Sequence, residues 1–165
     1  MFEKFGEFDS YEEINKAAEA QFNQGDMEAI RLMAAENGID KEDAEDFIYG
    51  ALEELTTPAL AAVGKLNVEC EDLKLKGVLL DWAEELKALC IQDGNFALAV
   101  RKKGKDLAGY IAKTADYGYE HRAVVDKSIV AKTEKIKSFI GNHEFSIGIP
   151  DKKIRKEIAV AYYLG

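Results

Sequence analysis

Signals that begin and end α-helices recur along the whole chain, and they constrain its fold more than any other feature of the sequence. Ser10 and Glu13 have capping-box spacing, so each side chain can satisfy a free amide at the start of a helix. Asp26, Asp40 and Thr57-Pro58 mark further starts, because such side chains accept hydrogen bonds from N-terminal amides and proline fits the first helical position. The chain is therefore predicted to be mainly α, with one or more small multi-helix bundles.

Apolar residues recur at helical spacing between these signals. One helix is expected to run from Asp40 to Leu55, since the apolar period continues over that length. Another is expected from Lys127 to about Phe139, after a cap at Asp126. A short extended segment is expected near residues 141–149, where apolar residues alternate. The other helices are expected after Ser10, after Asp26, after Thr57, at residues 76–91, 96–102 and 106–117, and after Pro150.

Charge is sorted along the chain. Residues 1–57 contain 16 Asp or Glu against 4 Lys or Arg, whereas residues 95–165 contain 14 Lys or Arg against 8 Asp or Glu. We therefore divide the chain into an acidic helical segment, residues 1–57, and a helical domain with a basic surface, residues 58–165. Exposed faces of opposite sign are typical of a protein that binds nucleic acid, or that binds another protein where it holds nucleic acid.

Acidic residues are densest between residues 40 and 54. A helix rises ~1.5 Å per residue, so a carboxylate-lined helix is similar in spacing to duplex DNA, which carries one phosphate charge per ~1.7 Å of axis. Such a face would bind a protein groove that normally holds nucleic acid. The alternative is that these residues complement the helix dipole and solvate the surface. The candidate protein-binding residues are Asp40, Glu42, Asp43, Glu45, Asp46, Glu53 and Glu54.

Basic residues form two clusters in the second half of the chain. Clusters of this kind attract phosphates without reading base sequence. The alternative is intramolecular, with the basic half folded against the acidic segment and partly neutralising it. The candidate nucleic-acid-binding residues are Arg101, Lys102, Lys103, Lys105, Lys152, Lys153, Arg155 and Lys156.

Patterns of catalysis and metal binding are missing from the sequence. His121 and His143 are the only histidines, and neither has a second His or a Cys at ligand spacing. There is no phosphate-binding glycine loop and no nucleophile elbow. Cys70 and Cys90 are expected to be small buried packing groups. We therefore expect a binding protein that is not an enzyme and needs no cofactor or metal.

Membrane and export signals are also missing. No run approaches the ~18 apolar residues of a membrane span. The first residues lack the basic start and apolar stretch of a signal peptide. We expect a cytoplasmic protein without a membrane partner.

Two stretches resemble the PcfK-like proteins of conjugative elements and phages. The first runs from Lys102 to Ala112, and the second includes Ile149–Ile154 and Ala159–Gly165. That family includes anti-CRISPR proteins that inhibit the type II RNA-guided DNA endonuclease. The resemblance implies a helical inhibitor that acts by stoichiometric binding in the cytoplasm of a bacterial host, with the nuclease and its guide RNA as partners. Two alternatives stay open: a DNA-binding accessory protein of conjugative transfer, and a purely structural adaptor.

Overall fold

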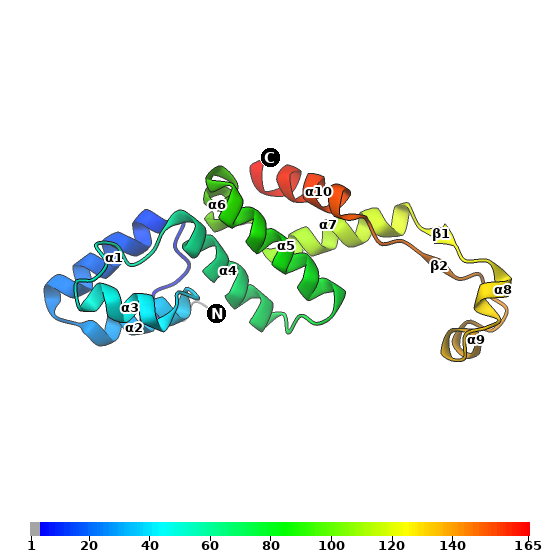
Figure 1. The fold of residues 1–165 in the computed structure, drawn as a ribbon, viewed down its shortest axis with the longest axis horizontal. Coiled ribbons are helices and arrows are strands. Elements are labelled where there is room, and N and C mark those ends of the chain that lie inside the picture. The colour runs from blue at the N-terminus through cyan, green and yellow to red at the C-terminus, as the bar shows by residue number, and fades with distance from the viewer. Residues whose placement is uncertain (1–3) are drawn as a thin grey trace.

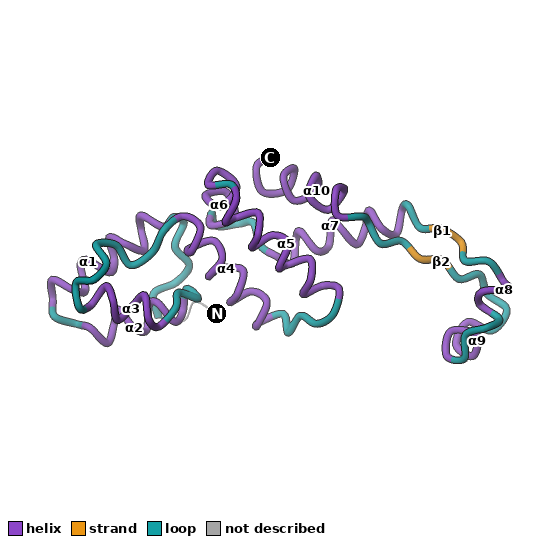
Figure 2. Tube along the Cα trace, in the orientation of Figure 1, coloured by secondary structure: helices purple, strands orange, loops and turns teal. Residues whose placement is uncertain are grey.

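The computed structural model describes residues 4–165 and shows an elongated, largely helical molecule (Figure 1; Figure 2). Within these residues there are 10 helices and one two-stranded sheet, which confirms the predicted mainly α class. The helices are α1 (Tyr11–Gln24), α2 (Met27–Glu36), α3 (Lys41–Ile48), α4 (Pro58–Asp72), α5 (Val78–Gln92), α6 (Gly94–Arg101), α7 (Leu107–Glu120), α8 (Lys127–Val130), α9 (Lys135–Ile140) and α10 (Lys152–Leu164), and the strands are β1 (Ala123–Val124) and β2 (Ser146–Ile147).

The helix starts expected from the sequence are present. Ser10, Asp26 and Thr57 each accept a hydrogen bond through the side chain from an amide in the first turn of α1, α2 and α4. Asp40 and Asp151 do the same for α3 and α10. These bonds satisfy amides that the helix itself leaves without partners, which is why the local sequence places the starts correctly.

Helices α1, α2 and α3 pack together at one end of the molecule (Figure 1). Their shared core is built around Ile14, Ile30, Met33 and Phe47, which are all buried. The single helix predicted from Asp40 to Leu55 is wrong, because α3 ends at Ile48.

A turn replaces the predicted last part of that helix. Gly50 adopts a left-handed φ of 76°, a conformation that glycine reaches without steric strain. The amides of Ala51 and Leu52 both bond back to the Asp46 carbonyl. Leu55, beyond this turn, is still buried in the core of α1–α3. The apolar residues that suggested a longer helix therefore include one that reaches the core from a loop.

Helices α4 to α7 and α10 surround a second core in the middle of the molecule. Leu66, Trp82, Phe96, Tyr110 and Tyr163 are among its buried side chains. Helix α4 lies against both cores, since Ala61 belongs to the first and Ala62 to the second. The division of the chain at residues 57 and 58 stays a prediction.

The two cores are joined where the end of α2 meets the middle of α4. Gly38, with φ 66°, lies against the backbone of Gly64, so closely that a Cβ on either residue would overlap main-chain atoms of the other segment. Beside this contact, the buried Asn37 side chain accepts a hydrogen bond from Arg101 Nη2 at 2.8 Å. The joint is therefore a close backbone contact reinforced by a buried polar bond.

A buried lysine fixes the loop between α6 and α7. Lys65 Nζ donates to the carbonyls of Lys102 at 2.7 Å and Lys105 at 2.9 Å, and it forms an ion pair with Glu7 at 3.0 Å. The side chain of Glu69, one turn further along α4, accepts a bond from the Leu107 amide at 3.0 Å. A charged group this deeply buried must be paired, and these bonds supply the partners while fixing the start of α7.

We expect Glu69 to make the stability of the protein depend on pH. Burial raises the pKa of its carboxyl from 4.5 to about 7, against the opposing effects of Lys65 and the Leu107 amide. A raised folded-state pKa stabilises the fold fully below pH 4.5, and this contribution is lost as pH rises through about 7. Relative to Glu69→Gln, the wild-type protein should lose about 3 kcal/mol of unfolding free energy between these limits.

Urea unfolding of both proteins at a series of pH values measures this difference. Comparing each pair at the same pH removes the contributions of the other carboxyl groups. A difference that does not change between pH 4.5 and pH 8 would show that Glu69 keeps an ordinary pKa in the folded protein.

Residues 121–150 form an arm that projects from the helical body (Figure 1). Strands β1 and β2 pair in antiparallel register, with Ala123 opposite Ile147, so the extended segment expected near residues 141–149 is confirmed at β2.

The single helix predicted from Lys127 to Phe139 is wrong, because the chain forms the short helices α8 and α9. Thr133 Oγ1 donates to the Val130 carbonyl and accepts from the Lys137 amide. Such local side-chain bonds compete with helix continuation.

Candidate binding surfaces

The predicted acidic residues lie on two segments instead of one helix. Asp40 is the N-cap of α3, where its carboxylate accepts the Glu42 amide at 2.9 Å. Glu42 and Asp46 are exposed on α3, and Asp43 is half-buried there. Glu45 also lies on α3, whereas Glu53 and Glu54 are exposed in the turn that follows α3. The predicted imitation of a regular phosphate row is therefore wrong, although the carboxylates are still concentrated at one end of the molecule.

Glu45 is neutralised within the fold. Arg31 on α2 donates to both oxygens of its carboxylate, at 2.6 and 3.0 Å. This bidentate bond holds the pKa of Glu45 below its ordinary value. Glu45 therefore connects α2 to α3 and is not available to a partner.

Both arginines in the predicted basic set form hydrogen bonds within the fold. Arg101 is buried and bonds to Asn37, so it belongs to the joint between the two cores. Arg155 on α10 donates to both oxygens of Glu85 on α5, at 2.9 and 2.7 Å. Assigning these two residues to a nucleic-acid-binding face was wrong, because each guanidinium has a partner far away in the sequence.

The lysines of the same set remain largely at the surface. Lys102 and Lys103 are exposed, whereas Lys105 is half-buried and its Nζ donates to the Tyr163 carbonyl at 3.4 Å. On α10, Lys152, Lys153 and Lys156 are exposed. The structure therefore leaves two separate groups of lysines, one in the α6–α7 loop and one at the start of α10.

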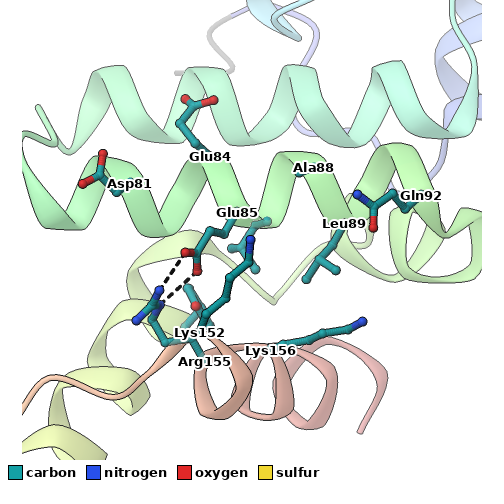
Figure 3. Close-up of a pocket in the computed structure, with 11 residues that line it drawn as sticks. Asp81, Glu84, Glu85, Ala88, Leu89, Gln92, Lys152, Arg155 and Lys156 are labelled. Carbon is teal, nitrogen blue, oxygen red and sulfur yellow. Dashed lines mark hydrogen bonds and ion pairs between the residues drawn. The ribbon is translucent and has the colours of Figure 1, made fainter.

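A cavity of about 380 Å³ lies between α5 and α10 (Figure 3). Asp81, Glu84 and Glu85 line it from α5, and Lys152 and Lys156 are among the residues that line it from α10. The Glu85–Arg155 pair crosses this space, as Figure 3 shows, and Arg155 also donates to the Pro150 carbonyl. The Glu85–Arg155 pair connects α5 to α10, whereas Glu84 accepts a hydrogen bond from Lys87 on its own helix.

A second, open groove of about 700 Å³ separates α1 from the turn that follows α3. Its walls include Glu12 and Glu19 from α1 and Glu53 and Glu54 from the turn. Phe22, Phe47 and Leu52 supply apolar surface in the same groove. We call this the α1–turn groove.

The sequence does not predict the α1–turn groove. Phe22 follows the buried Ala18 at helical spacing, a pattern typical of a buried face, but it is 39% exposed. Glu12, Lys16 and Glu19 are spaced to share one face of a helix, a signal that could have been noticed. Their approach to Glu53 and Glu54 depends on the turn at Gly50, which the helical pattern did not predict.

The described part of the chain contains no candidate metal site, and its two thiols are buried. Cys70 and Cys90 are buried, and burial raises the pKa of the Cys90 thiol to about 12, which keeps it protonated. Among residues 4–165, no group of three or more His, Cys, Asp or Glu side chains is arranged to hold a metal ion. Within the same range, none of the helices combines the length and the apolar character needed to cross a bilayer.

Residues 102–112 and 149–165, which carry the predicted family resemblance, lie against each other. The Asp106 amide donates to the Tyr162 hydroxyl at 3.1 Å. Gly109 lies so close to this hydroxyl that a Cβ there would overlap it. The Tyr110 and Tyr163 rings, 6.5 Å apart, continue the contact into the core. These residues therefore hold α7 against α10, which gives them a structural role.

Comparison of the chain with protein-family models, with curated proteins and with solved structures gives no match. The family resemblance therefore stays a prediction.

Proposed function

We propose that this protein inhibits the type II RNA-guided DNA endonuclease of a bacterial host by binding it stoichiometrically in the cytoplasm. The contact surface is the acidic end, which we define as α1, α2, α3 and the turn at residues 49–57. One observation carries the proposal: the charge sorting of the sequence persists as exposed charge in the fold, because Glu42, Asp46, Glu53 and Glu54 are exposed at this end. The PcfK-like resemblance supplies the class of partner.

The physical basis is electrostatic complementarity. Nucleases of this class hold their nucleic acids in positively charged channels. An exposed surface of carboxylates is attracted to such a channel and competes with DNA for it, and the inhibitor needs no chemistry of its own. Complementary charge raises the association rate and suppresses wrong partners more than it raises affinity, so this binding should weaken with added salt.

The acidic end is favoured over the basic residues for a structural reason. Arg101 and Arg155, which would have made the strongest phosphate contacts, are held by Asn37 and Glu85. The exposed lysines of the predicted set lie in two short groups, at the α6–α7 loop and the start of α10, apart from the exposed lysines of the arm at Lys127, Lys132, Lys135 and Lys137. Binding to DNA alone, as required of a conjugation accessory protein, therefore has less support.

A cleavage assay with purified nuclease, guide RNA and target DNA tests the proposal. Wild-type protein should stop cleavage once it reaches a small molar excess over the nuclease. A variant with Glu42→Gln, Asp43→Asn, Asp46→Asn, Glu53→Gln and Glu54→Gln should need about tenfold more protein, or about 1.4 kcal/mol of binding free energy. Asp40 and Glu45 are left unchanged because the fold uses them.

The matched control neutralises Lys102, Lys103, Lys152 and Lys153 by substitution with glutamine. It should inhibit as well as the wild-type protein. If the lysine variant loses inhibition and the acidic variant keeps it, the acidic end is not the contact surface. If the wild-type protein permits full cleavage at a large excess, the proposed function is wrong.

A further inference from the structure

The α1–turn groove combines an apolar floor with a negatively charged rim. Phe22 and Leu52 are 39% and 38% exposed, and both line the groove. The Phe22 ring packs edge-on against Phe47, with centroids 5.8 Å apart, so it is held in place from below. A groove with apolar side chains on its floor and charged ones on its rim fits a partner segment that carries an apolar stripe beside charges of the opposite sign.

The rim carries four carboxylates and one lysine. Glu12, Glu19, Glu53 and Glu54 line the groove, and Lys16 is the one cationic residue among its lining residues. A neighbouring phenol reports the resulting negative potential: the pKa of Tyr11 is raised, mainly by the charge of Glu12 and to a smaller extent by burial and Glu54. The pKa of Glu12 is lowered by a hydrogen bond with Ser10, so this carboxylate stays ionised at neutral pH. The rim therefore repels phosphates and attracts cations.

We propose that the α1–turn groove binds a cationic amphipathic α-helix of a partner protein. A helix lying in an apolar groove places side chains at positions i, i+3 and i+4 on the floor. In this groove they would contact Phe22 and Leu52. Lysines or arginines beside that apolar stripe would lie against Glu12 and Glu19 on one wall and Glu53 and Glu54 on the other. The rim carboxylates repel nucleic acid, and the apolar floor favours an amphipathic segment over a purely polar basic one.

The proposal for the α1–turn groove rests on the proposed function only in part. That the helix belongs to the nuclease rests on the proposed function. That the groove selects a cationic amphipathic helix rests on the floor and the rim alone. The two statements can therefore fail separately.

A direct binding experiment tests the groove with the full-length chain. The probe is a fluorescent leucine–lysine peptide of about 18 residues, which is about five helical turns, with leucines at helical spacing. A peptide of the same composition in scrambled order measures attraction by charge alone. Fluorescence anisotropy should show that the ordered peptide binds about tenfold more tightly than the scrambled one, since only the ordered peptide presents an apolar stripe to the floor.

Substitutions locate the binding. Glu53→Lys with Glu54→Lys, and separately Leu52→Asn, should each weaken binding of the ordered peptide by about tenfold. All three positions are exposed in a turn, and circular dichroism verifies that the variants fold. Glu71→Lys with Glu120→Lys changes the charge equally at exposed sites outside the groove, and this variant should bind as the wild-type protein does.

Several outcomes would overturn the groove proposal: equal binding of ordered and scrambled peptides, equal loss in the groove and control variants, or a wild-type self-association that the groove variant abolishes. Peptide binding without inhibition of the nuclease would leave the groove assignment standing and remove the proposed function. Inhibition without peptide binding would do the reverse.

Discussion

Gly64→Ala should destabilise the protein by about 3 kcal/mol, although the same change in an open helix interior stabilises by roughly 0.5–1 kcal/mol. Gly64 lies in the middle of α4, and a Cβ there would overlap the Asn37 carbonyl and approach the Gly38 backbone. A main-chain carbonyl cannot rotate away as a side chain can, so the end of α2 would have to move from α4. That movement would also strain the buried bond between Asn37 and Arg101.

Thermal and urea unfolding measure this effect, and Gly94→Ala is the matched control. Gly94 begins α6 and has no atom within 4 Å of a Cβ placed there, so its substitution should leave stability unchanged or raise it slightly. A Gly64→Ala protein as stable as the wild type would mean that α2 and α4 do not approach as closely as described.

Lys65→Met should cost about 3–5 kcal/mol of unfolding free energy, which is the usual penalty for removing one partner from a buried charged pair. Lys65 is only 1% exposed, and its ammonium group satisfies the carbonyls of Lys102 and Lys105. Methionine fills similar space but donates no hydrogen bond. The loop between α6 and α7 would lose its anchor, and the buried Glu69 carboxyl would lose the neighbouring cation that lowers its pKa.

A double variant separates the electrostatic cost from the loss of packing. At pH 8, adding Glu69→Gln to Lys65→Met should recover part of the stability, because the glutamine is neutral and needs no proton to occupy this buried position. Lys16→Met, at an exposed site on α1, should change stability by no more than about 0.5 kcal/mol. Equal stability of the Lys65→Met and Lys16→Met proteins would contradict the described anchoring role.

The helix starts could be predicted from the sequence because their determinants are local. Ser10, Asp26, Asp40 and Thr57 each bond to an amide two or three residues away. The helix ends were harder, because competing bonds decide them. The turn at Gly50 ends α3 early, although apolar residues continue at helical spacing beyond it. Thr133 lies between α8 and α9, where one long helix was expected, and its hydroxyl accepts a hydrogen bond from the Lys137 amide.

The candidate surfaces could be predicted only in part, for a similar reason. Charge sorting is a property of the sequence, and it correctly placed exposed carboxylates at one end of the fold. The partners of Arg101 and Arg155 are 64 and 70 residues away, so no local pattern reveals that these cations are occupied. The α1–turn groove likewise forms only when α1 and the turn at Glu53 are brought together.

Size-exclusion chromatography of this protein with the nuclease and guide RNA tests the central claim most directly. We predict that the wild-type protein co-migrates with the nuclease as a stoichiometric complex at low salt and that the complex weakens as salt is added. The variant neutralised at Glu42, Asp43, Asp46, Glu53 and Glu54 should elute separately under the same conditions. Separate elution of the wild-type protein, with and without guide RNA, would contradict the claim that the acidic end binds this enzyme.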